Sequence, residues 1–123
     1  VAVRHAGQIA VLRFPLTDLT QGKARPVLLL APVPGPYEDW LIAMISTQLQ
    51  HAVQGFDEIL DAREPDFQQS GLKLASVIRV GRLAVVSADV LLGAIGEIDS
   101  GRLRRICQHI ATWVQGVIPV SQS

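Results

Sequence analysis

The chain has 123 residues, the length of one domain, and we expect residues 1–123 to form a single domain with a core at 7–115 and a C-terminal tail at 116–123. Hydrophobic residues make up 49% of it, which excludes a disordered protein, and no apolar run is long enough to span a membrane. Eleven basic and eleven acidic residues cancel, which counts against non-specific binding to nucleic acid unless the basic side chains gather on one face.

The first two predicted strands flank a polar loop. Residues 8–14 alternate in polarity, which predicts a half-buried strand, and residues 16–24 are rich in loop formers. Residues 27–31 form a short apolar run typical of a strand buried on both sides. Pro26 precedes this run and restricts Arg25 to an extended conformation. Arg25 is therefore expected to be held stiffly at the mouth of the loop.

The rest of the chain reads as short strands, turns and one long helix. A loop is predicted at 31–39, strands at 40–45, 56–61, 76–87 and 90–98, a helical turn at 65–69, and a helix from 100 to about 115 capped by Asp99 or Ser100. This order predicts a mainly β protein, a small antiparallel barrel with a C-terminal helix. Such a barrel is filled with side chains, so a functional site must lie on its surface or between subunits.

Two features of the sequence concern its environment and its ligands. The N-terminal residues VAVRHAGQ lack a signal-peptide pattern, and the single cysteine, Cys107, cannot form an internal disulfide, which favours a cytoplasmic location. No spacing of histidine, cysteine and acidic residues suggests a metal site, and neither a metal nor another cofactor is expected.

Three arginines, Arg102, Arg104 and Arg105, crowd the start of the predicted C-terminal helix. Positive charge is unfavourable at this end of the helix dipole. These arginines either pair with acidic side chains or point into solvent, and exposure to solvent is the favoured interpretation.

Several motifs in this order resemble the MazF/PemK toxins of bacterial type II toxin–antitoxin pairs, over residues 7–114. They are Gly-x-Ile followed by Phe-Pro-x-Thr-Asp, then Arg-Pro-x-Leu-x-Leu from Arg25, Ile-Ser-Thr-Gln from Ile45, Ser-Val-Ile-Arg-Val from Ser76, and Ile-Gly-Glu-Ile from Ile95. The resemblance implies an SH3-like barrel that acts as a homodimer and cleaves RNA without a metal. It also implies a cognate antitoxin as partner.

The resemblance assigns site residues one by one. Arg25 matches the family's catalytic arginine, whose planar fork suits a phosphate group. Ser46 aligns with a hydroxyl residue that assists this arginine, and Thr47 and Gln48 follow as expected RNA contacts. The alternatives are a surface arginine paired with Asp18, and a Ser-Thr pair that only satisfies local backbone groups. Thr17 and Lys23, in the loop before Arg25, are further expected RNA-binding residues.

Arg79 is the third predicted catalytic residue. An arginine inside an apolar strand is costly unless it faces a groove or is paired. Some family members have Arg-x-Asp here, acting as acid and base, but Gly81 occupies the place of the aspartate. Period-two alternation puts Arg79 and Gly81 on one face and leaves an empty spot beside the arginine. The alternative for Arg79 is a salt bridge across the barrel, for example to Glu58.

Two functions remain open at this stage. The first is a toxin that cleaves single-stranded RNA, including mRNA, to 2′,3′-cyclic phosphate and 5′-hydroxyl ends. The second is a catalytically impaired SH3-like barrel that binds a partner peptide or RNA, which Gly81 and the neutral net charge favour. The family implies that a disordered antitoxin tail lies across the RNA groove, and Leu16, Tyr37 and Trp40 are candidates to receive its apolar side chains.

Overall fold

The computed structural model describes residues 2–3, 5–13 and 24–117 of the chain. Its elements are β1 (Gln8–Arg13), β2 (Ala24–Pro32), β3 (Asp39–Ser46), η1 (Leu49–His51), β4 (Glu58–Leu60), α1 (Phe67–Ser70), β5 (Ser76–Ser87), η2 (Ala88–Val90), β6 (Leu91–Glu97) and α2 (Ser100–Gly116). The six strands and the helices α1 and α2 match elements predicted from the sequence, with shifts of a few residues at their ends, whereas the short turns η1 and η2 were not predicted. No helix in the described ranges is long and apolar enough to cross a membrane.

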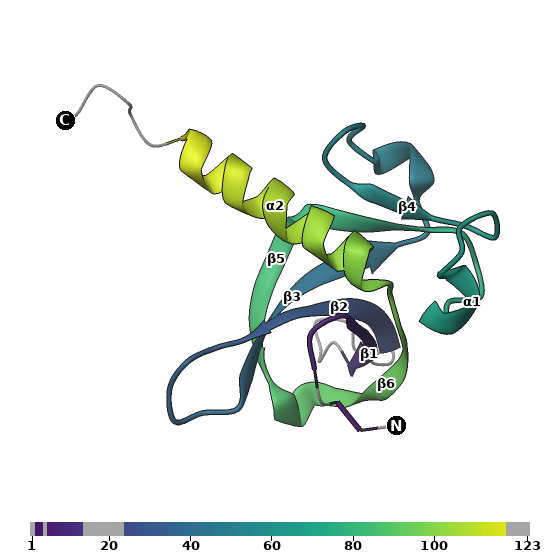
Figure 1. Cartoon of the computed structure of the whole chain (residues 1–123). Helices are drawn as coiled ribbons and strands as arrows, with labels where there is room; N and C mark the ends of the chain where they lie inside the picture. Colours follow the sequence, from purple (N-terminus) through teal and green to yellow (C-terminus); the bar gives the residue numbers. More distant parts are fainter. Residues whose placement is uncertain (1, 4, 14–23, 118–123) are drawn as a thin grey trace.

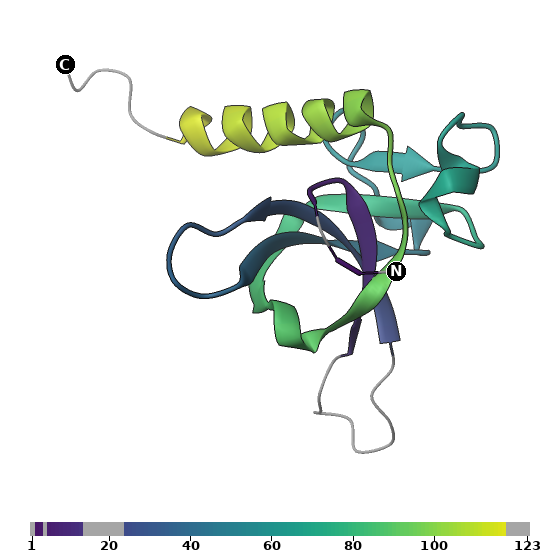
Figure 2. The ribbon, with the colours of Figure 1, turned by 60° about the horizontal axis from the view of Figure 1, so that its bottom comes forward.

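The six strands form one antiparallel sheet in the order β4-β5-β3-β2-β1-β6. Figures 1 and 2 show the sheet curving into a barrel-like body, which confirms the predicted fold class. Within the described residues the two edge strands, β4 and β6, do not pair, so the sheet is not closed. Instead α1 packs against β6, and a Cβ atom at either Gly71 or Gly96 would overlap the backbone of the other segment. Glycine at both positions permits this close approach.

The strand β2 is buried on both faces, as its apolar run predicts. Leu28 and Leu30 belong to one core cluster, and Val27 and Leu29 belong to a second cluster on the opposite face. The prediction that residues 8–14 form a half-buried strand was wrong for β1. Ile9 packs in the first cluster while Ala10 and Leu12 pack in the second, so core side chains cover both faces of β1.

The helix α2 begins at a capped N-terminus and lies across the first core cluster. The Asp99 carboxylate accepts a hydrogen bond from the Gly101 amide at 2.8 Å, as expected for an N-cap. Ile106 on this helix is completely buried in the core. Figure 1 shows the C-terminal end of α2 extending past the barrel. The apolar stripe of the helix continues there, and Val114 is 50% exposed.

Arg102 of α2 is buried and surrounded by carboxylates. Its Nε and Nη2 donate to both oxygens of Asp66, at 2.9 and 3.0 Å, while Nη1 donates to Glu58 at 2.8 Å and Nη2 to Glu64 at 2.6 Å. Arg105 also donates to Glu58, at 3.0 Å. The favoured interpretation of solvated arginines was therefore wrong for Arg102 and Arg105. The carboxylates come from β4 and the segment after it, which the fold carries to the start of α2.

The charge of Asp66 is stabilised by this cluster. Burial alone would raise the pKa of its carboxyl, but hydrogen bonds from Arg102 and the Asp99 amide outweigh burial and hold the pKa below the ordinary 3.8. Burial likewise opposes the charge of Arg102, but the Asp66 and Glu64 carboxylates raise the pKa of its guanidinium above the ordinary value. Both groups therefore stay charged in the folded protein at neutral pH.

We predict that Asp66 makes folding stability depend on acid pH. A carboxyl whose pKa is lower in the folded state adds stability above its unfolded pKa of about 4, and loses it as the pH falls through the folded value. Asp66→Asn should lower the free energy of unfolding at pH 7 by about 3 kcal/mol, because it leaves buried Arg102 incompletely paired. It should also flatten the pH dependence between about pH 5 and pH 2.

Urea denaturation at a series of pH values measures both effects. Asp61→Asn is the matched control, because the Asp61–Arg63 ion pair lies at the surface, where Arg63 is 89% exposed. The control should change stability much less. A pH dependence of Asp66→Asn that equals the wild-type curve would contradict the assignment.

Candidate functional site

The ends of β2 and β3 bring several predicted site residues together. Val27 lies opposite Met44 in this antiparallel pair, so Arg25 and Ser46, each two residues further, lie beside one another on the same face. Between the two strand ends is a cavity of about 190 Å³. It is lined by Ala24, Arg25, Pro26, Ile45, Ser46, Thr47, Gln48 and Ser76. The structure thus groups Arg25, Ser46, Thr47 and Gln48 around one space.

Arg25 is an exposed side chain on a rigid support. The residues that follow it, from Val27 to Leu30, lie in the two core clusters. Arg25 forms no ion pair with any residue in the described part of the chain. Its alternative partner, Asp18, lies outside the described residues, as do Thr17 and Lys23.

Ser46 makes a local contact that leaves its proton available. The Ser46 Oγ accepts a hydrogen bond from the Gln48 amide at 3.0 Å, a turn contact of the kind Ser-Thr pairs often make. A hydroxyl group that accepts one hydrogen bond still has its own O–H to donate. The Gln48 side chain is held in turn, because its Oε1 accepts from Gln50 Nε2 at 2.8 Å. Thr47, between them, is exposed.

Arg79 lies on the neighbouring strand β5, outside the cavity lining but on the same face. Arg79 is paired with Met44, and Val77 is paired with Ser46. Arg79 therefore lies on the same face as the Arg25–Ser46 pair, two residues further along the sheet. The Arg79 Nε is 3.5 Å from the Asp57 carboxylate. The suggested salt bridge to Glu58 was wrong, because Glu58 is engaged by Arg102 and Arg105.

The prediction of an empty spot beside Arg79, at Gly81, was also wrong. Ala43 pairs with Leu83 and Met44 with Arg79, so residues 80–82 form a bulge and simple alternation fails there. A Cβ atom on Gly81 would lie 3.3 Å from the ring of Phe56. An aromatic edge therefore occupies the space next to the glycine.

Ser76 is a cavity residue that sequence reasoning did not single out. It is 2% exposed, and its hydroxyl donates to the Leu74 carbonyl oxygen at 2.8 Å. It reaches the cavity because the start of β5 lies beside the end of β3. Only the strand order could have shown this, because the two segments are far apart in sequence.

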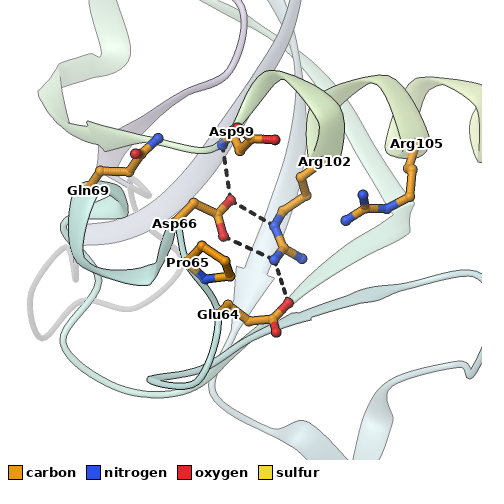
Figure 3. Close-up of a pocket in the computed structure, with 7 residues that line it drawn as sticks. All are labelled: Glu64, Pro65, Asp66, Gln69, Asp99, Arg102 and Arg105. Atoms are coloured by element: carbon orange, nitrogen blue, oxygen red, sulfur yellow. Dashed lines mark hydrogen bonds and ion pairs between the residues drawn. The ribbon is translucent and has the colours of Figure 1, made fainter.

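A second cavity, of about 300 Å³, lies over the Arg102 cluster. Figure 3 shows the guanidinium of Arg102 directed between Asp66 and Glu64, with Arg105 one turn further along the helix. The charged groups here partner one another, which indicates a structural role. In the described ranges, no three histidine, cysteine or acidic side chains are grouped so that they could hold a metal ion.

Comparison with known proteins agrees with this fold. The family model described as "PemK-like, MazF-like toxin of type II toxin-antitoxin system" matches residues 5–114. No curated protein matches the sequence. The Mycobacterium tuberculosis toxin MazF-mt6 is 21% identical, with a TM-score of 0.62, over 88% of this chain and 96% of that one.

Two further solved structures were determined as complexes. MazF in a MazE–MazF structure from Deinococcus radiodurans is 18% identical, with a TM-score of 0.66, over 96% of this chain and 100% of that one. An endoribonuclease in complex with its cognate antitoxin, from a Mycobacterial species, is 17% identical, with a TM-score of 0.62, over 95% and 100%. These likenesses show the same fold. Because the family model spans nearly the whole sequence, the chain belongs to the PemK-like, MazF-like family of toxins of type II toxin–antitoxin systems.

Proposed function

We propose that this protein is a cytoplasmic toxin that cleaves single-stranded RNA, including mRNA, without a metal ion. The products are a 2′,3′-cyclic phosphate and a 5′-hydroxyl end. The observation that supports this most strongly is the cavity where exposed Arg25 and the Ser46 hydroxyl lie side by side. A permanent cation and a neutral donor in one small space suit a phosphate group.

The reaction requires charge stabilisation at phosphorus. The 2′-hydroxyl loses a proton and attacks the neighbouring phosphorus, and the 5′-oxygen leaves and takes up a proton. Negative charge builds on the two non-bridging oxygens in between. The Arg25 fork donates to these oxygens, the Ser46 hydroxyl adds a neutral hydrogen bond, and Arg79 supplies positive charge on the same face.

The neutral net charge does not oppose RNA binding at this face. Three of the carboxylates, those of Glu58, Glu64 and Asp66, are used by Arg102 and Arg105. Arg25 has no such partner among the described residues. The equal numbers of acidic and basic side chains therefore leave, among the described residues, a cation at the cavity that no carboxylate pairs.

We predict that Arg25→Ala abolishes cleavage and that Ser46→Ala has a smaller effect. Loss of one preorganised neutral donor of an oxyanion hole already costs about 100- to 1,000-fold in rate, and loss of the charged Arg25 fork should cost more, which takes cleavage below detection. Loss of one neutral hydrogen bond costs about 1 kcal/mol, or roughly 5- to 10-fold. Purified protein is incubated with mixed RNA in EDTA, and the rate and the chemistry of the new ends are measured. Arg104→Ala, which removes an exposed arginine of α2, is the matched control and should cleave normally.

Full activity of Arg25→Ala, or a strict requirement for magnesium, would refute the proposed function. Wild-type protein that binds RNA or a peptide without cleaving RNA would instead support the alternative, a catalytically impaired barrel.

We also propose a homodimer and a shared groove for RNA and antitoxin. A cavity of about 190 Å³ accommodates little more than one nucleotide's phosphate and sugar, and two barrels side by side create a longer groove. An acidic, disordered antitoxin tail presents anions to Arg25 and Arg79, as RNA does. For its apolar side chains, Tyr37 is 74% exposed and suitable, whereas Trp40 is only 9% exposed, so its proposed role was wrong. Leu16 lies outside the described residues.

We predict that the cognate antitoxin and RNA compete for this protein. The probe is a fluorescent 2′-deoxy oligonucleotide, which binds without being cleaved, and antitoxin encoded by the neighbouring reading frame is titrated in. Arg25→Ala should weaken binding of both, and salt should weaken both further. Unchanged oligonucleotide binding at saturating antitoxin would reject the shared groove. Sedimentation of the free toxin as a 13.3 kDa species at micromolar concentration would reject the homodimer.

A further inference from the structure

Asp57 is a buried carboxylate in direct contact with Arg79. Its side chain is 2% exposed, whereas that of Arg79 is 20% exposed. Its Oδ1 accepts from the Val80 amide at 2.8 Å, and its Oδ2 accepts from the Val53 amide at 2.9 Å. Its Oδ2 is also 3.5 Å from the Arg79 Nε. Asp57 thus joins the segment before β4 to the part of β5 that carries Arg79.

The place of Asp57 in the sheet explains these contacts. The last residue of β5 that pairs with β4 is Ile78, which lies opposite Glu58. Beyond it β5 bulges at residues 80–82, and within the described part of the chain no strand pairs with the Val80 amide on that side. The Asp57 carboxylate takes the place of the missing strand and fixes the bulge immediately after Arg79.

The contact leaves most of the Arg79 donors unused. An arginine has five N–H donors in a rigid plane, and Asp57 lies nearest to the one on Nε. The four N–H groups on Nη1 and Nη2 make no hydrogen bond to any other residue that the structure describes. Because the guanidinium is planar, fixing Nε also limits the directions in which these four groups can point.

We propose that Asp57 is a positioning residue that holds Arg79 by its Nε, so that the Nη groups are presented to RNA phosphate on the face shared with Arg25. This inference rests on the proposed function. β5 has a glycine at 81, where some family members have an aspartate. Asp57 places a carboxylate beside Arg79 from a separate segment of the chain. It does not act as a base itself, because both oxygens already accept backbone amides and almost none of the side chain reaches solvent.

The first test is a double-mutant cycle on the rate of RNA cleavage. Arg79→Ala should lower the rate by about 100-fold, as for loss of one preorganised hydrogen-bond donor. Asp57→Asn should lower it by at least 10-fold, and the double variant should be no slower than Arg79→Ala alone. If Asp57→Asn costs the same factor with and without Arg79, its role is merely structural and the proposal is wrong. Asp61→Asn, an aspartate paired at the surface with Arg63, is the control and should leave the rate unchanged.

A second variant keeps the test valid if Asp57→Asn does not fold. Arg79→Lys keeps the positive charge and leaves Asp57 in place, but one ammonium group cannot contact Asp57 and also present a planar fork to a phosphate. It should lose nearly as much activity as Arg79→Ala. Full activity of Arg79→Lys would overturn the proposal.

The NMR signal of the Arg79 Nε–H group tests the contact without requiring cleavage. The signal is assigned by its loss in Arg79→Ala, and in wild-type protein it should exchange slowly with water. Rapid exchange in the wild type, or the same exchange rate in Asp57→Asn, would refute the contact. A protected signal in a wild-type protein that does not cleave RNA would refute the proposed function, and with it the catalytic use of this contact, but not the contact itself.

Discussion

The pairing of β2 with β3 is the constraint on which the candidate site depends. Arg25 and Ser46 meet because Val27 lies opposite Met44, two residues from each of them. A slip of one residue would turn every side chain of β2 to the other face and carry Arg25 away from the cavity. Burial resists this slip, because Leu28 and Leu30 pack in one core cluster while Val27 and Leu29 pack in the other. The same packing that forms the core therefore also sets the position of the cation.

Arginines in this protein have two physically distinct roles. Arg102 is 4% exposed and forms ion pairs with Asp66, Glu58 and Glu64. It therefore joins α2 to β4 and the segment that follows it. Removing one member of such a buried cluster leaves a charge that water cannot reach. Arg25 is exposed and free of carboxylates in the described part of the chain, which leaves its charge for a ligand. The net charge of zero does not distinguish arginines paired with carboxylates from those available to a ligand.

Local patterns were sufficient to predict most of the fold. Alternation, apolar runs, prolines and glycines marked the strands and turns, and Asp99 marked the start of α2. Contacts between distant segments were not predictable in this way. The partners of Arg102 lie 36 to 44 residues away in sequence, and nothing local links them to a helix terminus. Strand alternation predicted that Gly81 lies on the same face as Arg79, but the bulge at residues 80–82 breaks this alternation. For the candidate site, the motifs pointed to Arg25, Ser46 and Arg79, whereas the position of Ser76 in the cavity and of Asp57 beside Arg79 depends on strand order and register.

A crystal structure with a bound RNA tests most directly whether Arg25 and Ser46 hold the reacting phosphate. The RNA is a short strand cleaved by the protein, with the attacking 2′-hydroxyl replaced by hydrogen so that the strand stays intact. The expected result is that the oxygens of this phosphate lie within about 3 Å of the Arg25 guanidinium and the Ser46 hydroxyl. A phosphate bound at another surface, such as Arg104 on α2, with Arg25 left in solvent, would contradict the assignment of the site.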